Sequence, residues 1–246
     1  MSNLKDVLQD VISHTHGLGC IDLIKVSGTS ATTSISAVAE DKSVIVNGVF
    51  NTVVPDFEGV FGMPNLGQLK TVLGFDDYDA AAKLTVLRTT KDGVAIPSSI
   101  HFETKVGDFV NDYRLMAKAI IEDKVKSVSF KGAAWNVEFV PTVAGIMRLK
   151  KQWQANSSEA NFTTKIENGD LRIYFGEPST HSGNFVFHPM VTGALTRSWN
   201  WPVKQFIAIM DLVGDKIIRI SDQGAAEIVV DSGTAVYTYW LPAQAK

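Results

Sequence analysis

The predicted helices and strands of this chain follow an order that only a few folds can accommodate. Apolar side chains recur at helical spacing in four places: residues 4–13, 65–73, 142–155 and 201–213. Segments rich in β-branched residues, separated by turn signals, fill most of the remainder. The predicted helix starts lie 61 residues apart in the first half and 59 in the second. The sequence therefore predicts an α+β chain in which the order of helix, strands, helix, strands occurs twice.

The first half covers residues 1–110 and the second covers residues 127–246. Between them, residues 111–126 show neither a capped helix nor a clean strand alternation, although they contain apolar side chains. We interpret these residues as a connector between two domains. Within the second half, Asn168-Gly169-Asp170 separates two β-rich segments and is the clearest hairpin signal in the chain.

Composition and charge exclude several classes of protein. The chain has 246 residues, of which 45% are apolar, and its net charge is −3. These values fit a globular protein with a core, and a dedicated high-affinity DNA-binding protein would usually be more basic. Cys20 is the only cysteine, so an intrachain disulfide framework is excluded. The N-terminal segment lacks the layout of a signal peptide, and no apolar run approaches the roughly 18–20 residues of a membrane helix. We expect a soluble intracellular protein that does not bind a membrane.

No motif in the sequence predicts catalysis. His14 and His16 form an HxH pair, but no further ligands follow at a zinc-binding spacing. Cys20 lies in an apolar predicted strand and is interpreted as a core residue. His181 and His188 have neither the serine motif nor the nearby acid of a catalytic triad, and there is no glycine-rich phosphate-binding loop in the right context. We therefore expect no enzyme activity, no metal site and no cofactor.

Two stretches carry a resemblance to a known family. Gly59-Val60-Phe61-Gly62 runs into the helix predicted at residues 65–73, and the C-terminal run contains Tyr237-Thr238-Tyr239-Trp240-Leu241-Pro242. Together with the repeated element order, these stretches resemble the sliding clamps of tailed bacteriophages and, more distantly, proliferating cell nuclear antigen. The resemblance implies the DNA-clamp fold, in which each of two similar domains has two helices packed on mostly antiparallel sheets. It also implies that three subunits join head to tail into a closed ring whose hole is lined by the helices.

The resemblance implies a function as a DNA polymerase sliding clamp, or processivity factor. Such a homotrimer encircles duplex DNA without reading its sequence and tethers the replicative DNA polymerase, and an ATP-dependent clamp loader opens it. The implied location is the cytoplasm of a bacterial host cell, on replicating DNA. The alternative is a trimeric, β-rich phage structural protein of the head-decoration type, which shares the strand-rich and disulfide-free composition. An enzyme of unknown type is a third hypothesis.

Basic side chains on the non-core faces of the helices would face DNA in such a ring. The formal charges of the four predicted helices sum to +3, and those of all other residues sum to −6. Phosphate contacts attract DNA without reading its sequence. An ordinary solvated surface is the other interpretation of each of these residues. The candidates for facing DNA are Lys5, Lys70, Arg148, Lys150, Lys151 and Lys204.

Family members recruit partners through short peptides that dock in an apolar groove near the connector, and such docking relies on anchor side chains in pockets. The apolar residues that would line this groove here have an alternative interpretation, which is that they belong to the core. The candidates for lining the groove are Val38, Val44, Leu115, Ile120, Ile121, Tyr239, Leu241 and Pro242. For the contact between subunits, we expect edge strands at residues 106–110 and 171–175.

Overall fold

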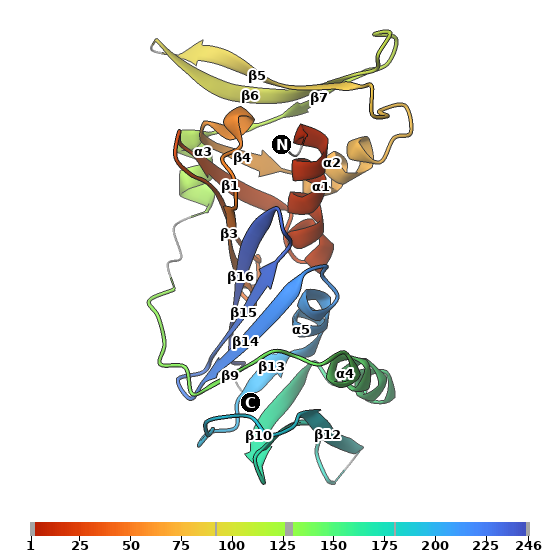
Figure 1. Cartoon of the computed structure of the whole chain (residues 1–246), viewed down its shortest axis with the longest axis vertical. Coiled ribbons are helices and arrows are strands. Elements are labelled where there is room, and N and C mark those ends of the chain that lie inside the picture. The colour runs from red at the N-terminus through yellow and green to blue at the C-terminus, as the bar shows by residue number, and fades with distance from the viewer. Residues whose placement is uncertain (1–2, 92, 126–129, 180, 245–246) are drawn as a thin grey trace. The chain divides into compact units, whose positions relative to one another are not determined.

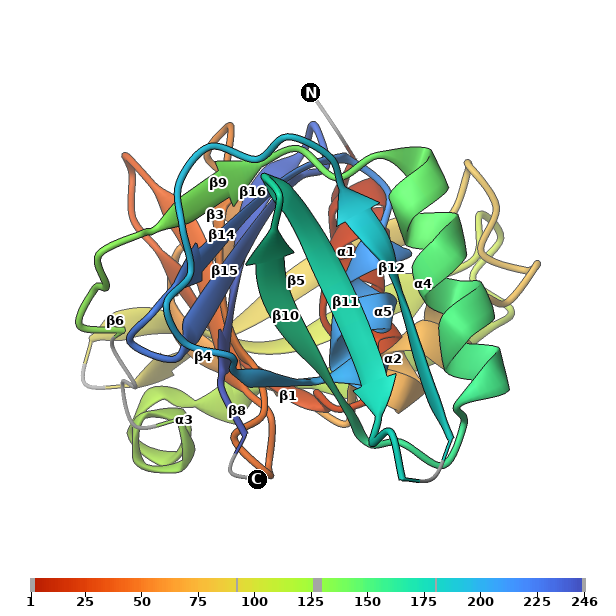
Figure 2. The same cartoon turned by 90° about the horizontal axis from the view of Figure 1, so that it is seen from below.

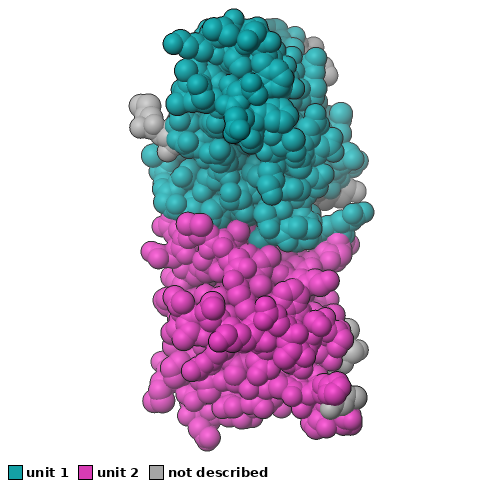
Figure 3. Space-filling model, turned by 90° about the vertical axis from the view of Figure 1, so that its right-hand side faces the viewer, with its two compact units in different colours: residues 1–40, 46–128, 232–237 teal, residues 41–45, 129–231, 238–246 magenta. Residues whose placement is uncertain are grey.

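A computed structural model of the chain describes residues 3–91, 93–125, 130–179 and 181–244. These residues form five α-helices, two short 3-10 helices and sixteen strands, which confirms the α+β class (Figure 1). The chain divides into two compact units (Figure 3). Unit 1 comprises residues 1–40, 46–128 and 232–237, and unit 2 comprises residues 41–45, 129–231 and 238–246.

Unit 1 contains two long helices and two sheets. The helices α1 (Leu4–His14) and α2 (Leu66–Leu73) pack against each other. The larger sheet has the order β8 (Met116–Ala117), β4 (Gly59–Pro64), β1 (Leu23–Gly28), β2 (Thr33–Val38), β3 (Ile45–Phe50) and the start of β16 (Ala235–Pro242). The smaller sheet consists of β5 (Lys83–Lys91), β6 (Val94–Glu103) and β7 (Val110–Arg114), all antiparallel. The short helices are η1 (His16–Leu18), η2 (Pro55–Phe57) and α3 (Lys118–Lys124).

The ends of α1 and α2 follow from local hydrogen bonds. Asn3 caps α1, because its side-chain oxygen accepts a hydrogen bond from the backbone N–H of Asp6 at 2.8 Å. Asn65 precedes α2 in the left-handed region with a φ of 53° and makes no side-chain cap. Instead, Asp22 accepts hydrogen bonds from the backbone N–H groups of Leu66 and Gly67 at 3.2 and 3.1 Å. The start of α2 is therefore fixed by a residue that is distant in the sequence.

Unit 2 repeats this arrangement. The helices α4 (Val143–Ala155) and α5 (Val203–Met210) pack against each other, and α4 runs alongside β12 (Figure 2). One sheet has the order β16, β15 (Ala225–Asp231), β14 (Asp215–Ser221) and β9 (Val137–Phe139). The other has the order β12 (Ser182–His188), β11 (Asp170–Gly176), β10 (Asn161–Glu167) and β13 (Asn200–Pro202). The hairpin predicted at Asn168-Gly169-Asp170 is confirmed, since it joins β10 to β11.

The fourth predicted helix is shorter than expected. The apolar spacing predicts a helix over residues 201–213, but Asn200–Pro202 forms the strand β13 and α5 begins at Val203. Trp201 is buried and lies opposite Phe162 of the neighbouring strand β10. Its indole N–H donates to the hydroxyl of Thr164 at 3.0 Å. Core packing and this hydrogen bond hold Trp201 in an extended backbone.

The predicted connector contains regular structure. Residues 111–126 include most of β7, all of β8 and the helix α3, and Lys126 lies outside the described residues. The side chain of Ile121 is buried against Gly62, where an added Cβ would lie only 2.8 Å from its Cδ1 atom. The absence of a side chain at Gly62 therefore lets α3 dock on β4. One β-rich segment that favours a strand, residues 125–130, falls mostly outside the described residues.

One of the two expected edge strands is not an edge. Residues 171–175 belong to β11, which pairs with β10 on one side and with β12 on the other, so that expectation is wrong. The edges of this sheet are β12 and the short β13. Residues 106–110 lead into β7, which does lie at the edge of its sheet. The pattern of apolar residues in a sequence does not distinguish a central strand from an edge strand of the same length.

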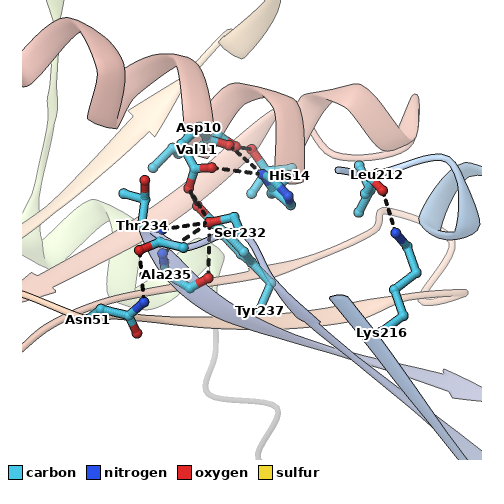
Figure 4. Close-up of polar contacts among 12 residues, drawn as sticks. Asp10, Val11, His14, Asn51, Leu212, Lys216, Ser232, Thr234, Ala235 and Tyr237 are labelled. Atoms are coloured by element: carbon cyan, nitrogen blue, oxygen red, sulfur yellow. Dashed lines mark hydrogen bonds and ion pairs between the residues drawn. The ribbon is translucent and has the colours of Figure 1, made fainter. Parts of the chain in front are cut away.

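Unit 1 is completed by residues from the far end of the chain (Figure 4). The carboxylate of Asp10 on α1 accepts hydrogen bonds from the hydroxyls of Tyr237 at 2.7 Å and Ser232 at 3.1 Å. His14, one turn further along α1, is buried, and its Nδ1 atom lies 3.3 Å from the Asp10 carboxylate. These contacts tie α1 to the turn before β16 and to β16 itself.

Candidate functional site

The two helix pairs turn different kinds of side chain outward. On α1 and α2 the exposed polar side chains are mainly uncharged, and the charged ones are Asp6 and Lys70. On α4 and α5 the exposed charged side chains are Arg148, Lys151 and Lys204, with Asp211 directly after α5. The exposed formal charge is therefore zero on the first pair and +2 on the second. Positive charge is concentrated on the helices of unit 2.

Three of the six cations predicted to face DNA have side chains available to solvent on α4 and α5. Arg148, Lys151 and Lys204 are exposed, and Arg148 is also 3.5 Å from the carbonyl oxygen of Val186. In the part of the chain that the structure describes, Lys151 and Lys204 make no ion pair. Lys70 is exposed on α2. These four ammonium and guanidinium groups are the ones that could meet a phosphate directly.

The other two predicted cations are engaged within the protein. Lys5 on α1 is partly buried, and its ammonium donates to the carbonyl oxygen of Tyr78. Lys150 on α4 forms an ion pair with Asp211 at the end of α5. The sequence could not distinguish these two lysines from the exposed ones, because both partners are distant along the chain.

A second lysine, Lys216 at the start of β14, bonds to the turn that follows α5. The ammonium of Lys216 points toward Leu212 and donates to its carbonyl oxygen and to that of Gly214, the latter at 3.0 Å (Figure 4). Burial lowers the pKa of Lys216, and the charges of Asp211 and Asp215 oppose this effect. The ammonium thus satisfies two carbonyl groups of the turn between α5 and β14.

Half of the residues predicted to line a partner groove are fully buried. Val44, Ile121, Tyr239 and Leu241 are each 0% exposed and belong to the cores of their units. Val38 and Leu115 are half-buried, and Ile120 and Pro242 are exposed. Side chains along β16 alternate between faces, so Tyr239 and Leu241 point into the core and Trp240 points to the opposite face.

Trp240 belongs to an aromatic cluster that the sequence pattern does not predict. The ring of Phe130 stacks on Trp135 at 5.8 Å and on Trp240 at 5.3 Å between centroids, and all three are half-buried. The indole N–H of Trp240 donates to Glu227 at 2.7 Å. The only sequence signal was the presence of three aromatic residues, without any indication that they meet.

Charged groups continue this surface beyond the aromatic cluster. The guanidinium of Arg219 pairs with Glu227 at 2.7 Å and also with Glu138. Hydrogen bonds from Arg219 to these two carboxylates raise its pKa. Strand β16, with the segment that precedes β9, thus presents half-buried aromatic rings next to a three-residue ion cluster with a net charge of −1. Aromatic side chains of this kind are enriched at protein interfaces.

The two histidines near the N-terminus each lie beside a carboxylate. His14 is buried beside Asp10, and His16 lies 3.5 Å from the carboxylate of Asp22. Among the described residues there is no group of three or more His, Cys, Asp or Glu side chains arranged to hold a metal ion. Cys20 is half-buried. No helix in the described part of the chain is long and apolar enough to cross a membrane.

Comparison with solved structures identifies a shared fold. The chain is similar to A. fulgidus PCNA solved with the C-terminal region of FEN-1 bound. The TM-score is 0.66, the identity is 13%, and the match covers 99% of this chain and 95% of that one. It is also similar to PCNA from Thermococcus kodakaraensis, with a TM-score of 0.63, 12% identity, and coverage of 98% and 95%. For PCNA from Entamoeba histolytica the TM-score is 0.65, the identity is 11%, and the coverage is 98% and 94%. No protein-family model and no curated protein sequence matches the chain. The chain has the fold of proliferating cell nuclear antigen over nearly its whole length.

Proposed function

We propose that this chain is the subunit of a ring-shaped DNA sliding clamp that serves as the processivity factor of a replicative, phage-type DNA polymerase. The observation that carries the proposal is the repeated helix pair within a fold similar to PCNA over 99% of the chain. In such a subunit the helices face the hole and the sheets form the outside. Fold alone does not assign a function, so the proposal also needs charge and assembly surfaces that suit encircled DNA.

The modest positive charge on α4 and α5 suits a protein that attracts DNA only weakly. We propose that Arg148, Lys151 and Lys204, with Lys70 of α2, approach the phosphates of the encircled duplex. Each such contact releases counterions and is therefore weakened by salt, and none of them reads the base sequence. Four cations per subunit give a modest attraction, which permits sliding.

Two edge strands could join neighbouring subunits head to tail. The edge strand β7 of unit 1 follows exposed apolar side chains at Val106 and Phe109. The edge strand β12 of unit 2 lies beside α4, whose residues Val143 and Met147 are exposed although apolar. We propose that β7 of one copy pairs with β12 of the next. Two unlike surfaces that meet by a closing rotation produce a ring, and we expect a homotrimer.

A clamp also needs a surface for the polymerase and for the ATP-dependent loader that opens the ring. We propose that this surface includes Trp240 and Trp135, because half-buried aromatic side chains often anchor a partner peptide. Ile120 and Pro242 are the remaining accessible members of the predicted groove. Tethering raises the local concentration of the polymerase at the DNA, so that a dissociated polymerase rebinds before it diffuses away. The clamp itself would catalyse no reaction.

A threading experiment tests the topological mechanism without a loader. The protein is mixed with linear duplex DNA that carries biotin at both ends, and streptavidin is then added to block the ends. We expect retention that resists a high-salt wash, because a closed ring does not depend on screened charges. Cutting the DNA internally should release the protein. Retention that is lost in salt, or that survives the cut, would refute encirclement.

The mass in solution provides the second readout. Light scattering should give three times the chain mass of 26.8 kDa. A trimer that is never retained on end-blocked DNA would favour the alternative of a phage structural protein. A monomer at micromolar concentration would contradict the proposed contact between β7 and β12.

A further inference from the structure

Asp211 is placed where a clamp would be expected to avoid negative charge. It follows the last residue of α5 and is exposed, with 48% of its side chain accessible. Lys204 and Asp211 are seven residues apart and lie on the same side of α5, with the half-buried Ala208 between them. The carboxylate thus shares an outward surface with one of the cations proposed to approach DNA.

The carboxylate of Asp211 holds the ammonium of Lys150. This ion pair joins the end of α5 to the middle of α4, and 35% of the Lys150 side chain remains accessible. Lys150 follows Arg148 and precedes Lys151 on α4, so it belongs to the same cluster of positive charge. Of the three cations in this cluster, Lys150 alone forms an ion pair among the described residues.

The surroundings of Asp211 leave Lys150 as its direct partner. The ammonium of Lys216 is close enough to interact with the charge of Asp211, but it donates to the carbonyl oxygens of Leu212 and Gly214. Asp215, the other carboxylate near Lys216, begins β14. The ammonium of Lys216 is therefore bound to carbonyl groups of the turn between α5 and β14, while the ammonium of Lys150 on α4 is bound to Asp211.

We infer that Asp211 limits the attraction of the clamp for duplex DNA by holding Lys150 away from the phosphates and by placing a negative charge beside Lys204. This inference rests on the proposed function. It assigns to Asp211 a positioning role that acts through Lys150. Ion pairs on an exposed surface are weak, so a phosphate passing close to α4 could compete for Lys150 without capturing it. The electrostatic attraction would then vary less along the surface that faces DNA, which lets the DNA slide.

The test measures how strongly salt weakens binding to DNA. Binding of a short fluorescent duplex is followed by anisotropy between about 50 and 200 mM salt, a range in which phosphate contacts dominate the salt dependence. We expect Asp211→Asn to bind roughly three- to sixfold tighter at about 0.1 M salt, because one added phosphate contact steepens the slope of log K against log salt by about 0.9. A merely structural role for Asp211 would leave this slope unchanged.

Two lysine variants provide matched controls. Lys151→Gln should reduce the slope by about 0.9, whereas Lys150→Gln should leave it nearly at the wild-type value. In the double variant Lys150→Gln, Asp211→Asn, most of the gain from Asp211→Asn should be lost. If Lys150→Gln reduces the slope as much as Lys151→Gln does, Lys150 already contacts phosphate and the inference is wrong.

The outcome separates this inference from the proposed function. A wild-type protein that shows no salt-dependent binding to the duplex would refute the DNA-facing role of the helices. Wild-type binding with an unchanged slope in Asp211→Asn would refute only the role of Asp211. Circular dichroism and light scattering of each variant check that fold and assembly are retained, and the Lys150→Gln comparison decides the question if Asp211→Asn does not fold.

Discussion

The imidazole of His14 stacks on the phenol ring of Tyr237, with 4.5 Å between ring centroids and 6° between ring planes. His14 belongs to the first helix of the chain and Tyr237 to its last strand. Both rings are buried, and both side chains reach the carboxylate of Asp10. This contact joins the two ends of the sequence within unit 1.

Loss of the Asp10 carboxylate should destabilise the protein. Asp10→Ala removes the carboxylate that accepts from the buried hydroxyl of Tyr237 and pairs with the imidazole of His14, and the loss of such buried polar contacts costs about 1–3 kcal/mol. Urea unfolding measures the difference. Gln9→Ala is the matched control, because Gln9 is exposed on the same helix and should change the free energy of unfolding by less than about 0.5 kcal/mol. Equal effects of the two substitutions would show that the cluster contributes nothing.

The same carboxylate should make the free energy of unfolding depend on pH in the acidic range. Burial alone would raise the pKa of Asp10, but the hydrogen bonds from His14, Tyr237 and Ser232 outweigh burial and hold it below the usual 3.8. A lowered pKa contributes stability that is complete above pH 3.8 and is lost as the pH falls through the value in the folded protein. The free energy of unfolding should therefore fall more steeply in acid for the wild type than for Asp10→Asn. Parallel curves below pH 3.8 would contradict the assignment.

Removal of the last strand should disrupt the first unit. Residues 232–237 belong to unit 1, and within them Ala235 and Tyr237 are completely buried. A chain that ends at Asp231 should expose the amide hydrogens of α1 and β3 to exchange. A chain that ends at Pro242 serves as the control, because it keeps the whole of β16. Unchanged exchange protection of α1 in the shorter chain would show that unit 1 is complete without residues 232–237.

A side chain at position 62 should displace α3. The Cβ of Gly62→Ala would lie 2.8 Å from the Cδ1 of Ile121 and 3.0 Å from the Cβ of Met116, and overpacking of this kind typically costs about 1–3 kcal/mol. We expect faster proteolysis within residues 118–124. Gly67→Ala is the control, since its Cβ would approach the ring of His16 only to 3.4 Å. Equal protection of α3 in the two variants would refute the docking role of Gly62.

Loss of a positive charge from α4 should weaken DNA binding, whereas loss of a positive charge from β10 should not. Lys151→Gln should weaken binding to a short duplex about three- to sixfold at about 0.1 M salt, since one phosphate contact is lost. Lys165→Gln removes the same charge from an exposed position on β10, above the ring of Tyr174, and should have little effect. Equal losses in the two variants would mean that DNA senses only the net charge of the protein.

The helix pairs could be predicted from the sequence because their signals are local. On α1, α2 and α4 the apolar spacing and the flanking cap, proline and glycine residues identify the start to within one residue. The fourth helix was extended too far, because the burial of Trp201 in a strand depends on contact with β10. The helix α3 was missed for a similar reason, since Ile121 docks on the distant Gly62.

The candidate site was harder to predict than the fold. Both faces of β16 carry large apolar or aromatic residues, so alternation alone could not show that Trp240 rather than Tyr239 reaches the surface. The pairing of Lys150 with Asp211 joins residues that are 61 positions apart. Sequence patterns report which residues share a face of one helix, but they do not report which charges meet across two helices.

The division of the chain has a consequence for synthesis on the ribosome. Residues 232–237 complete unit 1, yet 109 positions separate Val128 from Tyr237. At about 5–20 residues per second, the ribosome needs roughly 5–20 s to make them. During this interval β3 has no β16 to pair with, and Asp10 has no phenol to accept a hydrogen bond from. Until Tyr237 has been synthesised, the N-terminal part of the chain therefore has an open strand edge at β3, and unit 1 cannot complete its folding.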